Sequence, residues 1–240
     1  TTSRVAPGNF MSSPSQLGII RRVSSVVPNS MVFSVYRLPA GSIVVLLALV
    51  MLAGCGSLKP LPSDTFYRLD IKSQAGATVG SQRWTDKLIR ITKFSASGVH
   101  RERPIVYSQA GGVVVQQHRY HLWIDSPERM LQQELIDYLR EANVAPRISG
   151  SNLEGAGLEV RGDIRQMDQV TGGGDVKVVV IINFELIATE SRRSLILGRE
   201  YRQLFPVAGS DMSATALAMS AAVGEIFERF VVDATEALRN

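Results

Sequence analysis

Hydrophobic and polar residues alternate with a period of two in several segments after residue 64, a pattern that predicts β-strands. Gly- or Ser-rich stretches at 110–112, 171–175 and 191–194 separate neighbouring strands and predict tight turns. Because short turns join antiparallel neighbours, we expect a mostly antiparallel sheet. The predicted strands cover residues 66–71, 88–94, 105–108, 113–120, 158–165, 176–186 and 195–205.

Two other segments carry apolar residues spaced by three and four, which places them on one face of a helix. The first begins at Asp125-Ser126-Pro127-Glu128, which offers a capping side chain, a proline in the first turn and an early acid. It is expected to end near Asn143. The second covers about 211–238, with Ser210 or Asp211 as its cap. The sequence therefore predicts an α+β fold, in which two main helices pack on one face of a mostly antiparallel sheet.

The predicted strand 176–186 is apolar on both of its faces. Its inward positions are all apolar, and its other face mixes Val179 and Ile181 with Lys177, Asn183 and Glu185. The pattern leaves two interpretations open: the strand is central in the sheet, or its second face meets another subunit of a homo-oligomer.

Upstream of residue 55 the pattern changes to one continuous apolar run at 43–52. Arg37 lies before this run, and the small residues Ala53-Gly54 follow it. A basic flank, an apolar run and a small-residue site are typical of a secretory signal. A retained transmembrane helix is the alternative interpretation, but such a helix needs about 20 apolar residues. The ends of the uncharged stretch are interrupted by Pro39, Gly41, Gly54 and Gly56.

Leu52-Ala53-Gly54-Cys55 resembles the lipobox of bacterial lipoproteins. The resemblance implies cleavage before Cys55 and a membrane lipid anchor on its sulfur. Residue 56 is Gly rather than Asp, which by resemblance to sorted lipoproteins favours the outer membrane over the inner one. The cysteine is the only one in the chain, so an internal disulfide is excluded.

These features divide the chain into three parts. Residues 1–54 are an N-terminal extension with a lipoprotein signal peptide, 55–64 a Gly- and Pro-containing tether, and 65–240 a single periplasmic domain. Met31 opens a segment of ordinary signal length, so we expect translation to begin there.

The positive charge of the chain lies in the segment that would be removed. The whole sequence has 26 basic and 22 acidic residues and a pI near 9.4. Four of the basic residues and none of the acidic ones precede Cys55, which leaves a formally neutral domain. Nucleic-acid binding is therefore not expected.

No motif of the domain predicts catalysis or a bound metal. His118 and His121 are three residues apart, and on a strand they would point to opposite faces. Asp125 could join them in a ligand set, but the sequence offers no fourth ligand, so a metal site is not expected. The Gly172–Gly174 run lacks the Lys-Ser/Thr ending of a phosphate-binding loop and predicts a hairpin turn. No Gly-x-Ser-x-Gly hydrolase motif occurs. We expect a protein that is not an enzyme and that holds no cofactor.

Two aromatic residues, Tyr120 and Trp123, immediately precede the first predicted helix. They are candidate contacts for a partner protein, since such contacts are enriched in Tyr and Trp. The alternative interpretation is a hydrophobic staple that fixes the entry of the helix.

Read together, the motifs of residues 65–240 resemble the ABC-type transport auxiliary lipoproteins, the family of paraquat-inducible protein C. Each motif is weak, and the resemblance rests on their order and spacing. The motifs are Phe66-Tyr67-Arg68-Leu69, Leu88-Ile89-Arg90-Ile91, Pro104-Ile105-Val106-Tyr107, Tyr120, Trp123, Met130-Leu131, Leu135, Leu139 and Gly162-x-Ile164.

The resemblance implies a non-catalytic accessory of a transport system that moves phospholipid or other hydrophobic molecules across the periplasm. Its expected partners are a periplasmic MCE-domain protein and, through it, an ABC permease and ATPase. Homo-oligomers are known in this group. Two other functions stay open from the sequence: a stand-alone outer-membrane lipoprotein that binds a barrel protein or peptidoglycan, and a lipid-binding or hydrolytic protein that works alone.

Overall fold

The computed structural model describes residues 41, 45, 61–71, 83–151, 154–190 and 193–239. All but the first two belong to one compact unit, Pro60–Asn240, and only this unit is discussed below. The extension, signal peptide and lipobox predicted from the sequence, including Cys55, lie outside the described residues apart from Gly41 and Val45. No helix within the described residues is long and apolar enough to cross a membrane.

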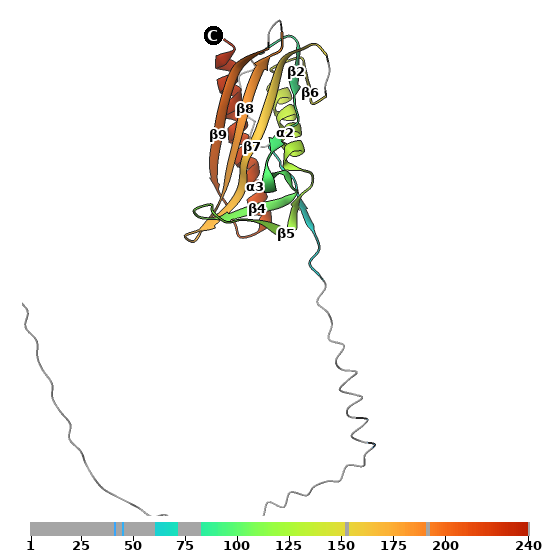
Figure 1. The fold of residues 1–240 in the computed structure, drawn as a ribbon, viewed down its shortest axis with the longest axis vertical. Helices are drawn as coiled ribbons and strands as arrows, with labels where there is room; N and C mark the ends of the chain where they lie inside the picture. The colour runs from blue at the N-terminus through green and yellow to red at the C-terminus, as the bar shows by residue number, and fades with distance from the viewer. Residues whose placement is uncertain are drawn as a thin grey trace, which may run out of the picture. The chain divides into compact units, whose positions relative to one another are not determined.

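The unit is a twisted sheet with two long helices against it (Figure 1). Both helices have nearly the bounds that the sequence predicts. In chain order the elements are β1 (Thr65–Tyr67), β2 (Leu88–Ile91), β3 (Ser95–Ala96), the 3-10 turn η1 (Gly98–Arg101), β4 (Pro104–Gln109), β5 (Val115–Trp123), α2 (Pro127–Glu141), β6 (Arg147–Ser149), β7 (Ala156–Gly172), β8 (Asp175–Ala188), β9 (Ser194–Pro206) and α3 (Met212–Ala237).

The α+β class is confirmed, but the sheet is mixed rather than mostly antiparallel. The pairs β4–β5, β7–β8 and β8–β9 are antiparallel hairpins, as the short turns predict. In contrast, β1 pairs in parallel with β5, β6 with β2, and each of β2, β3 and β4 with β7. The chain crosses over through α2 before it enters β6 and β7, and a helical crossover returns strands in the same direction.

Strand β7 joins two halves of the domain. One of its edges meets β2, β3 and β4 one after another, and its other edge pairs with β8 from Leu158 to Gly172. We call residues 61–151, with β1–β6 and α2, the N-terminal half, and residues 154–239, with β7–β9 and α3, the C-terminal half.

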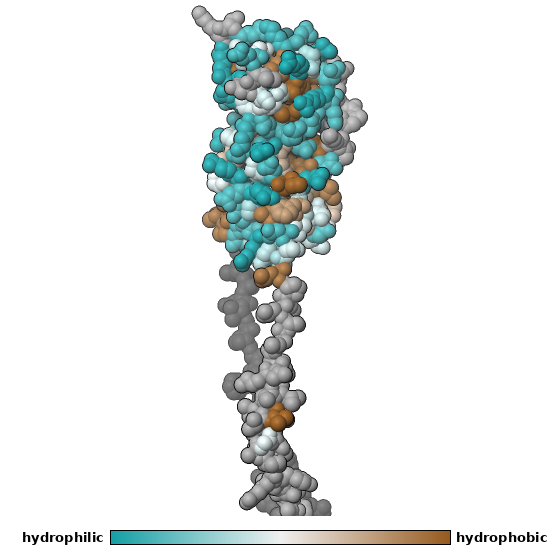
Figure 2. All heavy atoms as spheres, turned by 90° about the vertical axis from the view of Figure 1, so that its right-hand side faces the viewer, coloured by the Kyte–Doolittle hydropathy of each residue, from teal (hydrophilic) through white to brown (hydrophobic). Residues whose placement is uncertain are grey.

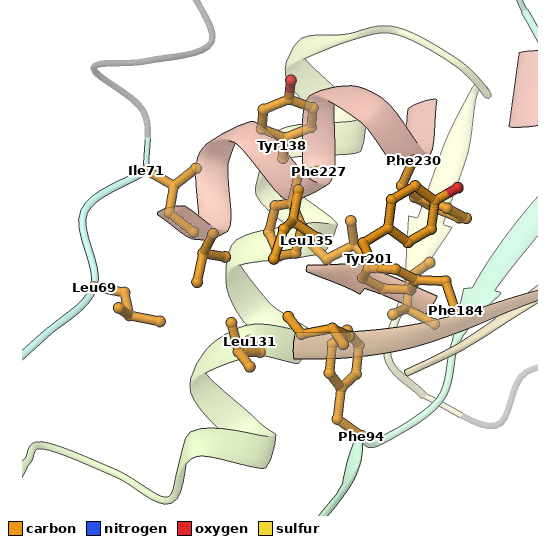
Figure 3. Close-up of a cluster of buried hydrophobic side chains, with 14 of the residues drawn as sticks. Leu69, Ile71, Phe94, Leu131, Leu135, Tyr138, Phe184, Tyr201, Phe227 and Phe230 are labelled. Atoms are coloured by element: carbon orange, nitrogen blue, oxygen red, sulfur yellow. The ribbon is translucent and has the colours of Figure 1, made fainter. Parts of the chain in front are cut away.

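The core lies between the sheet and the two helices (Figure 3). Phe184 of β8 stacks on Phe230 of α3 with ring centroids 4.4 Å apart, and Tyr138 of α2 meets Phe227 of α3 at 5.7 Å. Both helices therefore share one core on one face of the sheet. The predicted inward face of β8 is buried from Val178 to Leu186, and burial of such side chains contributes about 1.5–3 kcal/mol each.

Two features of β7 let the halves pack closely. The aromatic ring of Phe94, which follows β2, lies over Gly162, where a Cβ atom would come within 2.5 Å of the ring. A bulge between Ile164 and Gln166 then shifts the alternation, so that Met167 rather than Gln166 faces the core. Gly162 is thus required by a close approach, not by its backbone angles.

A charged cluster on the opposite face of the sheet also joins the two halves. The carboxylate of Glu159 in β7, 2% exposed, accepts hydrogen bonds from Arg90 of β2, Arg161 of β7 and Arg193 of the β8–β9 connection. Burial raises the pKa of Glu159, but the hydrogen bonds from Arg90 and Arg161 and the charges of Arg90 and Arg193 outweigh it and lower this pKa below 4.5.

The strand predicted at 66–71 is shorter than expected, although its alternation of burial is correct. Leu69 and Ile71 are buried and Arg68 and Asp70 are exposed. Only residues 65–67 pair with β5. The backbone N–H of Asp70 donates instead to the hydroxyl of Ser220 in α3 at 3.1 Å, so the chain leaves the sheet for the helix layer.

The two interpretations of strand 176–186 are resolved in part. β8 pairs with β7 on one side and β9 on the other, so it is a central strand. On its second face Val179 and Ile187 are nevertheless buried within this single chain. The third apolar residue on that face, Ile181, is half-buried, so the single chain covers most of this apolar surface.

Candidate interaction site at the tether end

Tyr120 and Trp123 both lie in β5 but in different surroundings. Trp123 is 2% exposed and belongs to the core, and its backbone N–H donates to the carbonyl oxygen of Arg103 at 2.7 Å. Tyr120 is half-buried, with the guanidinium carbon of Arg119 5.5 Å from its ring centroid. A partner can therefore reach Tyr120, whereas Trp123 offers almost no surface in this structure.

The hydrophobic staple, the other interpretation of these aromatic residues, is not formed in its usual way. A staple places an apolar side chain directly before the N-cap residue. The N-cap of α2 is Ser126, and the residue before it is Asp125, whose Oδ1 accepts the N–H of Ser126 at 2.7 Å. The aromatic residue that precedes the helix is instead anchored in the core.

A wide bulge in β5 surrounds Tyr120. Pro104 of β4 lies opposite Leu122, but Val106 lies opposite Gln117, so one residue of β4 faces the four residues 118–121. The bulge overturns the prediction that His118 and His121 point to opposite faces: their ring centroids are 5.7 Å apart. The sequence carries no signal for it, because the bulge depends on which residues of β4 pair with β5.

The bulge builds a row of four rings in tilted or edge-to-face contact. Tyr107 lies 4.5 Å from His118 between ring centroids, and His121 lies 5.8 Å from Tyr67. The Tyr67 hydroxyl and the His121 Nδ1 atom are 2.9 Å apart. Burial, and to a smaller extent the charge of Asp211, raise the pKa of Tyr67, so the phenol that shares this hydrogen bond stays protonated at neutral pH.

The other end of this row is fixed to the helix layer. His118 Nε2 lies 3.0 Å from the side-chain oxygen of Gln169 in β7, and the Gln169 amide donates to the Thr215 hydroxyl in α3 at 2.9 Å. Both histidines are therefore occupied by hydrogen bonds. Among the described residues, no group of three or more His, Cys, Asp or Glu side chains could hold a metal ion.

The rings lie at the end of the domain where β1 enters, which we call the tether end (Figure 1). Thr65 lies beside His121 in the sheet, so the chain enters along the outer side of β5. The β4–β5 turn, the β7–β8 turn and the start of α3 lie at this same end. Figure 2 shows a mostly hydrophilic side of the domain, with several apolar side chains at the surface near this end.

Two shallow clefts flank the link between β9 and α3 at the tether end. One, of about 730 Å³, is lined by Lys177, Phe205 and Val207 among others. The second, of about 360 Å³, lies between Phe205 and the exposed Leu217 of α3. Both are open, mixed surfaces that suit contact with another molecule better than enclosure of a small one.

The structure also brings together a set of residues that the sequence did not group. His100 Nδ1 lies 3.5 Å from Asp168 Oδ1, and Ser108 lies on the neighbouring strand, two pairs beyond Asp168. Their composition is that of a hydrolase triad. However, Ser108 is buried in the middle of β4 and not on a strand-to-helix elbow, so an acyl substrate cannot reach it in this structure.

The structure thus defines a two-layer α+β domain with open surfaces for contact at the tether end. The chain belongs to the family described as the ABC-type transport auxiliary lipoprotein component, whose model matches residues 67–230. The resemblance found in the sequence is thereby confirmed. The chain is an auxiliary component of an ABC-type transport system and a member of a lipoprotein family. No curated protein sequence matches it.

Solved structures share the fold. A Xanthomonas campestris protein, grouped under the family model DUF330, has a TM-score of 0.61 and 15% identity; the match covers 70% of this chain and 92% of that one. A second, uncharacterised protein has a TM-score of 0.58 and 10% identity, over 72% of this chain and 99% of that one. At these identities the likeness concerns the fold alone.

Proposed function

We propose that this protein is a lipid-anchored, non-catalytic accessory subunit of an ABC/MCE-type system that moves phospholipid or other hydrophobic molecules across the periplasm. The observation that carries the proposal is the family match, which runs from β1 into α3 and begins shortly after the lipobox. ATP chemistry would belong to the partner, because the chain has no Walker sequence.

Cys55 is the proposed site of lipidation, with Leu52-Ala53-Gly54 as the recognition sequence for cleavage. Each buried methylene of an acyl chain contributes about 0.8 kcal/mol, so several chains would hold the domain on the membrane almost permanently. Gly56 supports sorting to the outer membrane. Confinement to that surface raises the effective concentration for the partner, so weak contacts suffice.

The proposed partner is a periplasmic MCE-domain protein, and Tyr120 is the proposed contact on this chain. The ring of Tyr120 is half-buried, so a partner can reach it. Tyr120 lies in the bulge of β5, where hydrogen bonds hold the neighbouring rings of His118 and His121 in place, so this surface loses little conformational freedom on binding. Homo-oligomerisation is compatible with this role, since a ring of subunits would present several such contacts at once.

A pull-down from solubilised membranes tests the partner. The lipidated chain, used as bait in cells that express the MCE-type protein, should retain that protein, and a Tyr120→Ala bait should retain less of it. Trp123→Ala is unsuited as a variant because it would damage the core. A bait that recovers a barrel protein and no MCE-type protein would support the stand-alone assembly function instead.

Replacement of Cys55 by alanine tests the anchor. The Cys55→Ala chain should fold as before but leave the membrane fraction, because the acyl chains are the main attachment. Intact-mass measurement of the unmutated protein should show cleavage before Cys55 and added acyl mass. A Cys55→Ala chain that still sediments with outer membranes would contradict the proposal.

A further inference from the structure

The β4–β5 turn at the tether end carries a cluster of exposed valines. Val113 is 93% exposed, Val114 53% and Val115 40%. Single exposed apolar residues are common at protein surfaces, but three consecutive ones at the tip of a hairpin are not, because turns favour Gly, Asn, Asp and other polar residues. The predicted turn residues Gly111 and Gly112 supply the positive φ angles, so the valines are not needed to make the turn.

The turn has a rigid base. The N–H of Ala110 donates to Thr171 at 2.9 Å, and that of Gly112 to Gln109 at the same distance. The β7–β8 turn packs against it so closely that a Cβ atom on Gly172 would come within 2.5 Å of the Ala110 Cβ. The valines are therefore presented outward on a fixed hairpin that the core of the domain does not cover.

The charges around the turn fit a lipid surface. Residues 108–118 contain no Asp, Glu, Lys or Arg, and the next residue, Arg119, is exposed. Asp175 and Lys177 at the start of β8 are the nearest charges on the neighbouring turn and balance each other. With the hairpin tip in a membrane, the uncharged valines would lie at the level of the acyl chains and the exposed Arg119 at the level of the lipid headgroups.

The position of the turn brings it to the membrane. The chain enters the sheet beside His121 of β5, the strand whose first residue is Val115. If Cys55 is lipidated, the segment 56–64 spans at most about 30 Å even when fully extended. The end of the domain that holds the turn is then the end kept nearest to the lipid.

We infer that Val113, Val114 and Val115 form a second membrane contact, in which the tip of the β4–β5 hairpin enters the boundary between headgroups and acyl chains. This inference rests on the proposed anchor at Cys55. With the lipid anchor alone, the domain could turn freely on its tether. With the tip inserted as well, the sheet has a fixed orientation on the membrane, and Tyr120 is held close to the surface.

A fluorescent label tests the contact in the full lipidated protein. Val114→Cys, labelled with the polarity-sensitive dye NBD, is placed on vesicles of phosphatidylethanolamine and phosphatidylglycerol. The matched control is Leu195→Cys, an exposed apolar position at the start of β9, away from the tether end. We expect the Val114 label to shift its emission to shorter wavelength and to be quenched by nitroxide-bearing acyl chains, with no change for Leu195.

The outcomes separate the two proposals. Protein that floats with the vesicles while its Val114 label stays in water overturns the second contact alone. A chain that carries no acyl group and does not float overturns the anchor, and the second contact with it. A Val114 label that responds to the MCE-type protein but not to lipid assigns the valines to a protein interface and also overturns the inference.

Discussion

The two halves of this domain use different pairing rules around one shared strand. The C-terminal half is a three-stranded antiparallel meander with α3 across it, and its strands follow one another with short turns. The N-terminal half consists of short strands, most of which pair in parallel with β7 or with one another. The C-terminal half thus builds a platform from local contacts, and the N-terminal half is held to it by contacts between residues distant in sequence.

The comparison implies that the platform carries most of the stability and that contacts along β7 couple the halves. The candidate site lies in the half with the weaker local structure. Its bulge, its ring row and its exposed turn are therefore fixed by attachment to β7 and α3. We therefore expect the largest loss of stability from a substitution in the platform, a smaller loss from substitutions at the contacts between the halves, and the smallest loss at the helix ends.

The largest effect is expected from Phe184→Ala in the platform. Phe184 is fully buried and its ring meets those of Phe94, Tyr201, Phe227 and Phe230. Loss of the ring should lower the free energy of unfolding by about 3–5 kcal/mol, measured by urea denaturation. The control is Asn183→Ala, the adjacent position on the other face, with an effect within about 0.5 kcal/mol. Equal effects of the two would contradict the assignment of faces.

Gly162→Ala tests the coupling of the halves. The new Cβ atom would lie 2.5 Å from the ring of Phe94, so the ring must move and the stability should fall by about 2 kcal/mol. The double variant Gly162→Ala with Phe94→Leu should recover part of this loss, because the smaller side chain leaves room. Strictly additive effects would show that the two residues do not act through this contact.

Glu159→Gln tests the ionic part of the same coupling. At pH 7 the free energy of unfolding of the variant should be lower by about 1–2 kcal/mol, because the charged hydrogen bonds to the arginines are weakened. The loss is not larger because these arginines are partly exposed and are hydrated instead. The folded pKa of Glu159 lies below its ordinary value of 4.5, so its contribution is present above pH 4.5 and is lost as the pH falls through the folded pKa. Urea denaturation should show this difference between the two proteins shrinking from pH 7 to pH 3; a constant difference would exclude the ionic explanation.

The smallest effects are expected at the helix ends, where the halves also differ. Asp211 Oδ1 accepts the N–H of Ala214 at 2.8 Å at the start of α3, so Asp211→Ala should cost about 1 kcal/mol. The N-cap of α2, Ser126, makes no such bond, and Ser126→Ala should change the stability little. Thermal unfolding compares the pair; a larger loss at Ser126 would reverse the assignment of the two caps.

The sequence by itself determined the local elements. Alternation and turn signals located the longer strands but missed the short β3 and β6. Asp125-Ser126-Pro127 and Asp211 located the helix starts, and the turn residues located the hairpins, because these signals depend on neighbouring residues only. The order of weak motifs along the chain also sufficed for the family. The predicted strand 113–120 included Tyr120 but ended before Trp123, which also lies in β5.

Only the tertiary structure decided how the elements pair and which side chains meet. The parallel pairing of β2, β3 and β4 with β7 joins residues about 70 positions apart, which no turn signal can report. The bulge that brings the ring of His118 against the ring of His121 arises from a register set by β4. The burial of Trp123 and the exposure of Val113 depend on what packs nearby. Alternation predicts on which face of the sheet a residue lies, but the residues that it contacts there depend on how the whole domain packs.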